Sequence, residues 1–382
     1  MHPRQFCHLA IGTILALATP LLLLGCGESH QDLVLAPTAT PTQTPRPGFL
    51  QTNLVADVVG VAANTDAALL NPWGVAYAPT GPFWVSDNHS GVSTLYNGSG
   101  MPFPSPTPLV VTIPPPPGVS DPAAPTGIVF NGTTDFVVTA GSNSGPSLFI
   151  FSTEDGTLSG WSQGVDVANA ILMVDKSGSD AIYKGLALGS NASGNFLFAT
   201  DFHNGRVEVF DKNFAPATLA GSFTDPNLPA GFAPFGIHNI GGSLYVTYAK
   251  QDENQEDDVK GAGNGYVNVF DMNGNMIKRF ASQGSLNSPW GIALAPASFG
   301  QFSNALLVGN FGDGRITAFN TSSGAVLGQL TDTHGTPIAI DGLWALIFGN
   351  GANAGSTNTL FFSAGPGDEE HGLFGSLRAA SE

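Results

Sequence analysis

Four oxygen-bearing side chains alternate along the acidic run 252–258, the one dense charge cluster of the chain: Asp252, Asn254, Glu256 and Asp258. Hard cations such as Ca²⁺ prefer carboxylate and amide oxygens. The run is therefore a candidate site for calcium or another divalent metal. However, Asp257 occupies the place where an EF-hand loop needs glycine, and no bidentate glutamate follows. We favour the competing interpretation, a solvated hairpin loop.

A second set of reactive side chains lies within three residues of glycines that recur in apolar runs: Asn71, Lys184, His238 and Asp341. If those runs are innermost strands of one ring, these side chains are candidates for a shared axial ligand site. His238 and Asp341 come from different repeats and form the best pair for binding a ligand or metal. The alternative is that each caps or hydrogen-bonds its own strand.

The sequence Gly160-Trp-Ser-Gln-Gly164 matches the G-x-S-x-G pattern of a serine nucleophile. That pattern works on a strand–turn–helix element, with an acid and a histidine placed later in the chain. Here it lies between runs typical of strands. We predict a polar turn without catalytic function.

A repeat of 51–58 residues organises the chain from residue 71 onward. Its marker is a glycine early in an apolar run, at Gly74, Gly127, Gly185, Gly236, Gly291 and Gly342. Two further strand-like runs follow each marker, and several of the later runs alternate apolar and polar residues. Units of about 50 residues built from short antiparallel strands are typical of propeller blades. We predict an all-β, six-bladed β-propeller in which the glycines permit close packing near the axis.

The ends of the repeat predict how the ring closes. The sixth unit stops after its third strand, whereas residues 49–58 form a strand-like run ahead of the first unit. Because an unpaired edge strand invites aggregation, we expect this N-terminal run to supply the outer strand of the last blade.

The N-terminal segment predicts where the protein is localised. Residues 1–25 combine Arg4 with an apolar run typical of a signal peptide. Leu23-Leu24-Gly25-Cys26 resembles a bacterial lipobox, which makes Cys26 the expected lipidation site. Residues 26–47 are rich in threonine and proline and read as an extended tether, leaving 48–382 for the propeller. We expect an extracytoplasmic protein attached to a membrane by its lipid, with the outer membrane or cell surface favoured.

Composition excludes several functions. The 12 Lys and Arg against 29 Asp and Glu give a net charge of −17, which disfavours nucleic acid as a partner. The 2 cysteines are Cys7 and Cys26, so removal of the signal and acylation leave the folded part without thiols. Disulfides, thiolate metal sites and a cysteine nucleophile are thereby excluded from the propeller.

The repeats resemble NHL-type propeller repeats. Nearly all of 49–377 is similar to a family of exported bacterial propellers of unknown function, some with PEP-CTERM sorting signals. The stretches that carry the likeness include Asn71-Pro-Trp-Gly, Phe83-Trp-Val-Ser-Asp-Asn, Gly309-Asn-Phe-Gly-Asp-Gly and Asp341-Gly-Leu-Trp-Ala-Leu. The resemblance implies a fold and a compartment, and it supplies no catalytic residues. Six-bladed gluconolactonase-like enzymes, of different sequence, hold a divalent metal at the axis.

Two function classes follow. The first is a non-catalytic binding module that presents a propeller face to a cell-surface protein, peptide or glycan. The second is a metal-dependent hydrolase or lyase that works at an axial pocket. We favour the first, because the sequence defines no convergent set of acids and histidines. Convergence of His238, Asp341 and a further carboxylate on one pocket would favour the second.

Overall fold

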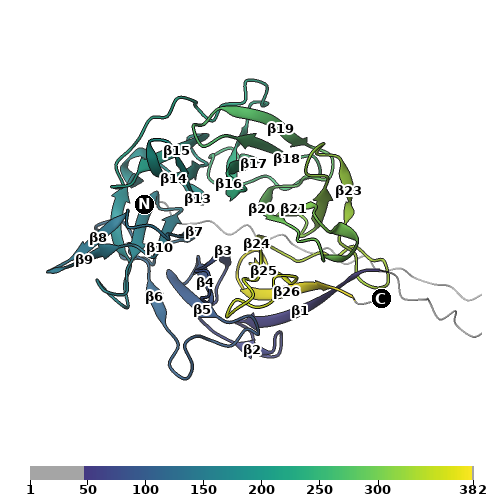
Figure 1. The fold of residues 1–382 in the computed structure, drawn as a ribbon, viewed down its shortest axis with the longest axis horizontal. Helices are drawn as coiled ribbons and strands as arrows, with labels where there is room; N and C mark the ends of the chain where they lie inside the picture. The colour runs from purple at the N-terminus through teal and green to yellow at the C-terminus, as the bar shows by residue number, and fades with distance from the viewer. Residues whose placement is uncertain (1–46, 381–382) are drawn as a thin grey trace, which may run out of the picture. The chain divides into compact units, whose positions relative to one another are not determined.

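Six antiparallel sheets surround a central axis in the part of the chain that the structure describes (Figure 1). The computed structural model describes residues 47–380. Its helical content within that range is two short 3-10 turns, Ser177–Ser179 and Gly300–Phe302. The predicted six-bladed β-propeller is confirmed.

Each blade is one sheet whose first strand lies innermost, with its later strands toward the rim (Figure 1). The strands of blades one to three are β3 (Pro72–Tyr77), β4 (Phe83–Asp87), β5 (Val92–Tyr96) and β6 (Val110–Thr112); β7 (Pro125–Phe130), β10 (Phe149–Thr153), β11 (Thr157–Trp161) and β12 (Ile171–Asp175); and β13 (Tyr183–Asn191), β14 (Gly194–Asp201) and β15 (Arg206–Asp211). The strands of blades four to six are β16 (Phe232–Ile240), β17 (Ser243–Lys250), β18 (Gly265–Phe270) and β19 (Met276–Ser282); β20 (Pro289–Leu294), β21 (Leu306–Asn310), β22 (Ile316–Phe319) and β23 (Val326–Gln329); and β24 (Leu343–Phe348), β25 (Leu360–Ala364) and β26 (Leu373–Ala379).

Blade two departs from the expected strand order. The first strand-like run after Gly127, at residues 135–139, predicts the second strand of this blade. In the structure, β8 (Val137–Ala140) instead pairs with β9 (Asn143–Pro146) in a separate hairpin at the rim of the ring (Figure 1). The second strand is β10, whose Phe149 pairs with Phe130 of β7. The hairpin is an insertion. Val138 of β8 is buried in an apolar cluster with Ile150 and Leu158 of the blade, which explains the apolar pattern of this run.

The ring closes through the N-terminal strand, as the sequence predicts. Strand β1 (Phe49–Ala56) pairs antiparallel with β26, from Phe49 opposite Ala379 to Ala56 opposite Leu373. The two-residue strand β2 (Asn64–Thr65) adds to β1 in parallel. Residues from the two ends of the chain therefore share the sheet of blade six.

Neighbouring innermost strands approach so closely that side chains are excluded at the marker glycines. A Cβ built on Gly74 would lie 2.4 Å from the carbonyl oxygen of Thr126 in the next blade. At Gly291 the corresponding atom is the carbonyl oxygen of Trp344, at 2.3 Å. The expectation that glycine allows blades to crowd at the axis is confirmed for these blades.

The sixth marker glycine was assigned to the wrong place in its blade. Strand pairing shifts between residues one and four of the innermost strand in blades one, five and six. This irregularity aligns Ala345, rather than Gly342, with Gly74 and Gly291. Gly342 precedes β24 in a turn with φ +65°, where glycine is favoured for its backbone conformation.

Hydroxyl groups join the blades where the strand pairing is interrupted. Thr200 of β14 donates to the carbonyl oxygen of Phe235 in the next blade at 2.6 Å. Ser363 of β25 donates to the carbonyl oxygen of Trp73 and accepts from the backbone N–H of Ala345. Buried backbone groups left free by the irregular pairing thus find partners.

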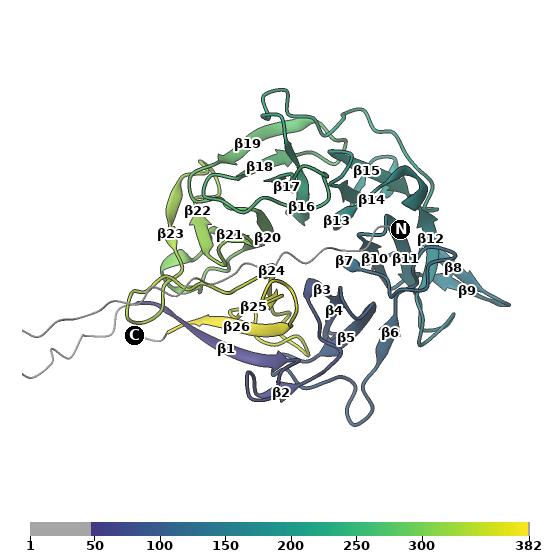
Figure 2. The same ribbon diagram turned by 180° about the vertical axis from the view of Figure 1, so that it is seen from behind.

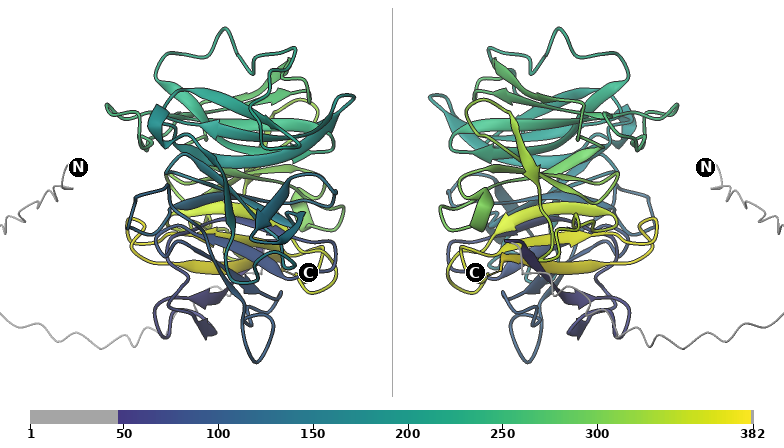
Figure 3. Two further views of the ribbon diagram at one scale, coloured as in Figure 1. Left: turned by 90° about the vertical axis from the view of Figure 1, so that its left-hand side faces the viewer. Right: turned by 90° about the vertical axis from the view of Figure 1, so that its right-hand side faces the viewer.

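The propeller has two axial faces. At the start face the six innermost strands begin, and there the loops between second and third strands also lie, because those strands pair antiparallel. At the end face the innermost strands finish. Figure 2 shows the ring from behind, and Figure 3 shows it from the side.

No helix in the described range 47–380 is long and apolar enough to span a membrane. The predicted signal peptide (1–25), the lipidation site Cys26 and almost all of the tether (26–47) lie outside the described residues.

Ring closure predicts a sharp contrast between two adjacent residues of β1. Phe49 is 1% exposed, and its ring centroid lies 4.8 Å from that of Phe299 in blade five. Replacing Phe49 by Ala should lower the free energy of unfolding by about 3–5 kcal/mol through lost burial and a cavity. Leu50, at 37% exposed, is the control, and Leu50→Ala should cost far less. Equal losses in urea denaturation would contradict closure through β1.

Candidate functional site

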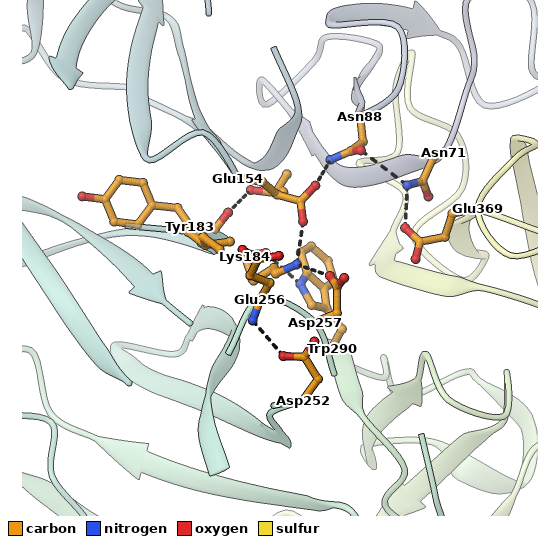
Figure 4. A network of polar contacts seen from close by, with 12 residues as sticks. Asn71, Asn88, Glu154, Tyr183, Lys184, Asp252, Glu256, Asp257, Trp290 and Glu369 are labelled. Carbon is orange, nitrogen blue, oxygen red and sulfur yellow. Dashed lines mark hydrogen bonds and ion pairs between the residues drawn. The ribbon is translucent and has the colours of Figure 1, made fainter. Parts of the chain in front are cut away.

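A buried lysine lies at the centre of the start face. The side chain of Lys184, in β13, is 2% exposed, and its Nζ donates to Glu154 Oε1 at 2.5 Å and to Asp257 Oδ1 at 3.1 Å (Figure 4). Glu154 follows β10 of blade two, and Asp257 comes from the loop between β17 and β18 of blade four. Three blades therefore meet at one ammonium group.

Two amides extend this cluster to blades one and six. Asn88 Nδ2 donates to Glu154 Oε2 at 2.9 Å, and Asn71 Nδ2 donates to Glu369 Oε2 at 2.6 Å. Asn71 Oδ1 in turn accepts from Trp344 Nε1 at 3.1 Å. We call the six residues Asn71, Asn88, Glu154, Lys184, Asp257 and Glu369 the axial network.

An aromatic layer lies beneath the axial network. Trp73 and Trp344 stack with ring centroids 3.5 Å apart, and Trp290 meets both edge-on. All three indoles are at most 3% exposed, so they serve as packing between blades and offer no open platform for a sugar. Lys184 Nζ lies 5.4 Å from the Trp73 ring centroid, while Trp73 Nε1 has no hydrogen-bond partner among residues 47–380.

Burial shapes the charges of the axial network. Burial, followed by the nearby charge of Glu154, raises the pKa of Glu369 to about 7, against the hydrogen bond from Asn71. Burial alone would lower the pKa of Lys184, but Glu154 and Asp257 outweigh it, so this pKa lies above its ordinary value. Lys184 therefore stays charged, whereas Glu369 changes charge near neutral pH.

The structure brings two of the four predicted axial residues together. Asn71 and Lys184 both belong to the axial network. His238 instead lies toward the end face, where its Nε2 is 3.1 Å from the carbonyl oxygen of Trp290, and burial lowers its pKa to about 4. Asp341 is exposed at the start face and accepts from the backbone N–H of Gly367 at 2.8 Å.

His238 and Asp341 therefore do not converge. Asp341 caps the loop that carries Glu369, which matches the alternative interpretation of a local hydrogen-bonding role. All innermost strands run from the start face to the end face. His238 is near the end of β16, whereas Asp341 precedes β24, so the two residues lie toward opposite faces. The pairing on one pocket that would have favoured an axial metal enzyme is not formed.

The acidic run forms the expected loop of blade four, but its side chains diverge. Asp252 Oδ1 accepts from the backbone N–H of Glu256 at 2.9 Å within the turn (Figure 4). Asp257 reaches Lys184, and Asn254 is exposed. Burial raises the pKa of Asp258. Within residues 47–380 no three His, Cys, Asp or Glu side chains are grouped to hold a metal ion.

Two of the start-face residues that sequence reasoning missed share a position in the repeat. Asn88 and Glu154 each directly follow the second strand of their blade, as do Phe202 and Phe311. Phe202 and Phe311 join the aromatic layer. Aligning the ends of the second strands would have identified this position, because it recurs whatever the length of the loop.

The fold and its axial site define a six-bladed propeller with a site built by several blades. Among solved structures, the soluble aldose sugar dehydrogenase of Escherichia coli in its apo-form matches with a TM-score of 0.50 at 12% identity, over 87% of this chain and 100% of that one. A virginiamycin B lyase from Staphylococcus aureus matches with a TM-score of 0.44 at 14% identity, over 87% and 99% of the two chains. At such identities the likeness to the dehydrogenase shows the fold alone.

The sequence places the chain in a family. It is 33% identical over 331 residues to uncharacterized protein R648 of Acanthamoeba polyphaga mimivirus, covering 85% of this chain and 78% of R648. Uncharacterized protein L690 of the same virus is also 33% identical, covering 83% and 82%. The chain belongs to the family of these proteins, and no family model matches it. These relatives are viral, so the bacterial origin and sorting signals implied by the earlier resemblance receive no support.

Glu369 predicts a pH-dependent stability. Its carboxyl has a pKa of about 7 in the folded chain against an ordinary 4.5, so the unfolded state releases its proton first as pH rises. The stability contributed by protonated Glu369 is therefore lost between about pH 4.5 and 7. Glu369→Gln should match the parent near pH 5 and exceed its free energy of unfolding near pH 8 by on the order of 1 kcal/mol.

Glu370→Gln removes a neighbouring exposed carboxylate and is the control for this measurement. Urea denaturation at both pH values should show that the free energy of unfolding of Glu369→Gln gains on that of the parent as pH rises, whereas Glu370→Gln should show no such gain. If the free energy of unfolding of the two variants changed with pH in parallel, the raised pKa of Glu369 would be contradicted.

Proposed function

We propose that the chain is a binding module whose axial network receives a positively charged amine, from a peptide or a small molecule, at the start face. The supporting observation is that five blades contribute charged and amide side chains to one polar network, with the buried ammonium group of Lys184 held by Glu154 and Asp257 within it. Burying ion pairs contributes little net stability. Such an arrangement on the axis is therefore better explained by ligand binding than by folding.

The charge balance of the network favours a cation. Glu154, Asp257 and Glu369 carry −3 when ionised and Lys184 carries +1, so the network holds −2. Among the described residues, no protein donor contacts Glu369 Oε1 or Asp257 Oδ2, which leaves two acceptors for an incoming ammonium group. Trp73 Nε1, buried in the aromatic layer and unpaired among residues 47–380, offers a donor to a ligand acceptor or a water molecule.

The proposal predicts binding of putrescine, a short diamine, with 1,4-butanediol as the uncharged control of the same length. Calorimetry should show putrescine binding that strengthens several-fold between pH 6 and 8, as Glu369 loses its proton. The diol should bind far more weakly. Glu369→Gln should remove most of the pH dependence, whereas Glu370→Gln should retain it. Equal binding of diamine and diol, or equal effects of the two variants, would overturn the proposal.

A catalytic role at the same face is the second candidate. A carboxyl with a pKa of about 7 is suited to give or take a proton at neutral pH. Glu369 shares its network with a second glutamate, Glu154, as acid–base chemistry often requires. This observation favours a hydrolase or lyase acting through carboxylates. The described residues offer no ligand set for the metal-dependent form of this idea.

We further propose that the mature chain is an extracytoplasmic protein held at a membrane by lipid on Cys26. The support is the sequence Leu23-Leu24-Gly25-Cys26 after an apolar run, and one thiol carrying two or more acyl chains anchors durably. The Cys26→Ser variant, expressed in a bacterial host, should move from the membrane fraction to the soluble fraction. Unchanged fractionation of the variant would count against lipidation.

A further inference from the structure

A cavity of about 510 Å³ opens at the end face, on the opposite side of the aromatic layer from the axial network. All six innermost strands contribute to its wall, for example through Ala76, Ile128, Leu188, Ile240, Leu294 and Phe348. Its volume falls within the range of small-molecule sites. A wall built by every blade is fixed by ring closure itself.

Among the residues that the structure describes, the wall of this cavity carries no formal charge. None of its lining residues is Asp, Glu, Lys or Arg, and its polar side chains are Tyr77, His238 and Asn239, with the indole of Trp290. Asn239 is already engaged, since its Nδ2 donates to the carbonyl oxygen of Leu188 and its Oδ1 accepts from Gly242 N–H. A charged ligand would lose its hydration without gaining a counter-charge.

The floor of the cavity is polar at one point. Trp290 lines the cavity but directs its Nε1 away to the carbonyl oxygen of Lys184 at 2.9 Å. The carbonyl oxygen of Trp290 contacts His238 Nε2 at 3.1 Å. A carbonyl oxygen only accepts hydrogen bonds, so Nε2 of His238 carries the proton.

His238 therefore offers its other nitrogen as an acceptor. Burial lowers its pKa to about 4, so the ring is neutral at physiological pH. In a neutral imidazole with its proton on Nε2, Nδ1 has a free lone pair. Within the described chain, no protein group donates to Nδ1 of His238. The nitrogen is left as an unused acceptor at the edge of an apolar cavity.

We propose that the end-face cavity binds an uncharged, largely apolar small molecule that donates one hydrogen bond to His238 Nδ1. The apolar wall supplies affinity through burial, and the imidazole selects for a hydroxyl or N–H group. This site is independent of the axial network, because the stacked tryptophans lie between the two faces.

The test uses paired probes that differ in one donor: indole with 1-methylindole, and 2-naphthol with 2-methoxynaphthalene. Calorimetry on the full propeller at pH 7.5 should show each donor-bearing probe binding about 5- to 10-fold more tightly than its methylated partner. In His238→Phe, which keeps a ring but removes the acceptor, both members of each pair should bind equally. Indole-3-acetate should bind more weakly than indole.

Two further variants locate the binding site. Leu294→Trp places a large side chain at a half-exposed wall position and should abolish binding of every probe. Leu148→Trp, at an exposed position outside the wall, should leave binding unchanged. Thermal melts establish that each variant is folded. No binding of any probe at 1 mM, equal binding within both pairs, or loss of binding in Leu148→Trp would overturn the proposal.

Discussion

Where the innermost strands of neighbouring blades meet, the backbone has room for little more than a hydrogen atom. At Gly236 a Cβ would lie 2.3 Å from the carbonyl oxygen of Trp290. This close approach shifts the strand pairing at the start of each affected strand and frees backbone groups, which hydroxyls such as that of Thr247 then satisfy. The same contraction brings the start-face loops within reach of one another. A wider ring would leave Lys184 without partners from other blades.

The contraction also explains why the axis is partitioned. Three indoles pack together between the two faces, with the polar axial network on one side and the apolar wall of the cavity on the other. Trp290 contacts both sides, since its Nε1 bonds the backbone of Lys184 and its carbonyl oxygen bonds His238. One residue thus holds elements of two chemically different sites in place, through its indole on one side and its backbone carbonyl on the other. The two sites share this frame, but no charged side chain of the axial network lines the cavity.

Sequence patterns predicted the propeller fold well because each blade packs closely against its neighbour, which requires small residues and apolar strands at the same positions of every repeat. The glycine markers, the strand runs and the closing run at 49–58 all follow from that demand. The misplaced marker at Gly342 shows the limit, since the equivalent position in blade six holds Ala345, where the strands accommodate a methyl group. The hairpin of β8 and β9 was misread because a local apolar pattern does not reveal which strand it pairs with.

The candidate site was predicted only in part for a related reason. Asn71 and Lys184 lie beside the repeat markers, so the strand pattern located them. Asp257 and Glu369 lie within loops of different length, where no periodicity applies, and Glu154 could be found only by aligning the ends of the second strands. His238 and Asp341 were paired because both flank innermost strands, but proximity to a strand does not say which end of the axis a side chain faces.

The construction of the axial network by separate loops has an evolutionary consequence. Apart from Lys184, which lies in β13, the members of this network come from segments outside the strands in four blades. A change in one such segment alters the contacts of that segment and leaves the packing of the strands intact. Recognition can then diverge among descendants one blade at a time, under selection that acts separately on frame and loops. In such a lineage, conserved strands and a shared ancestry would say little about which molecule any one member binds.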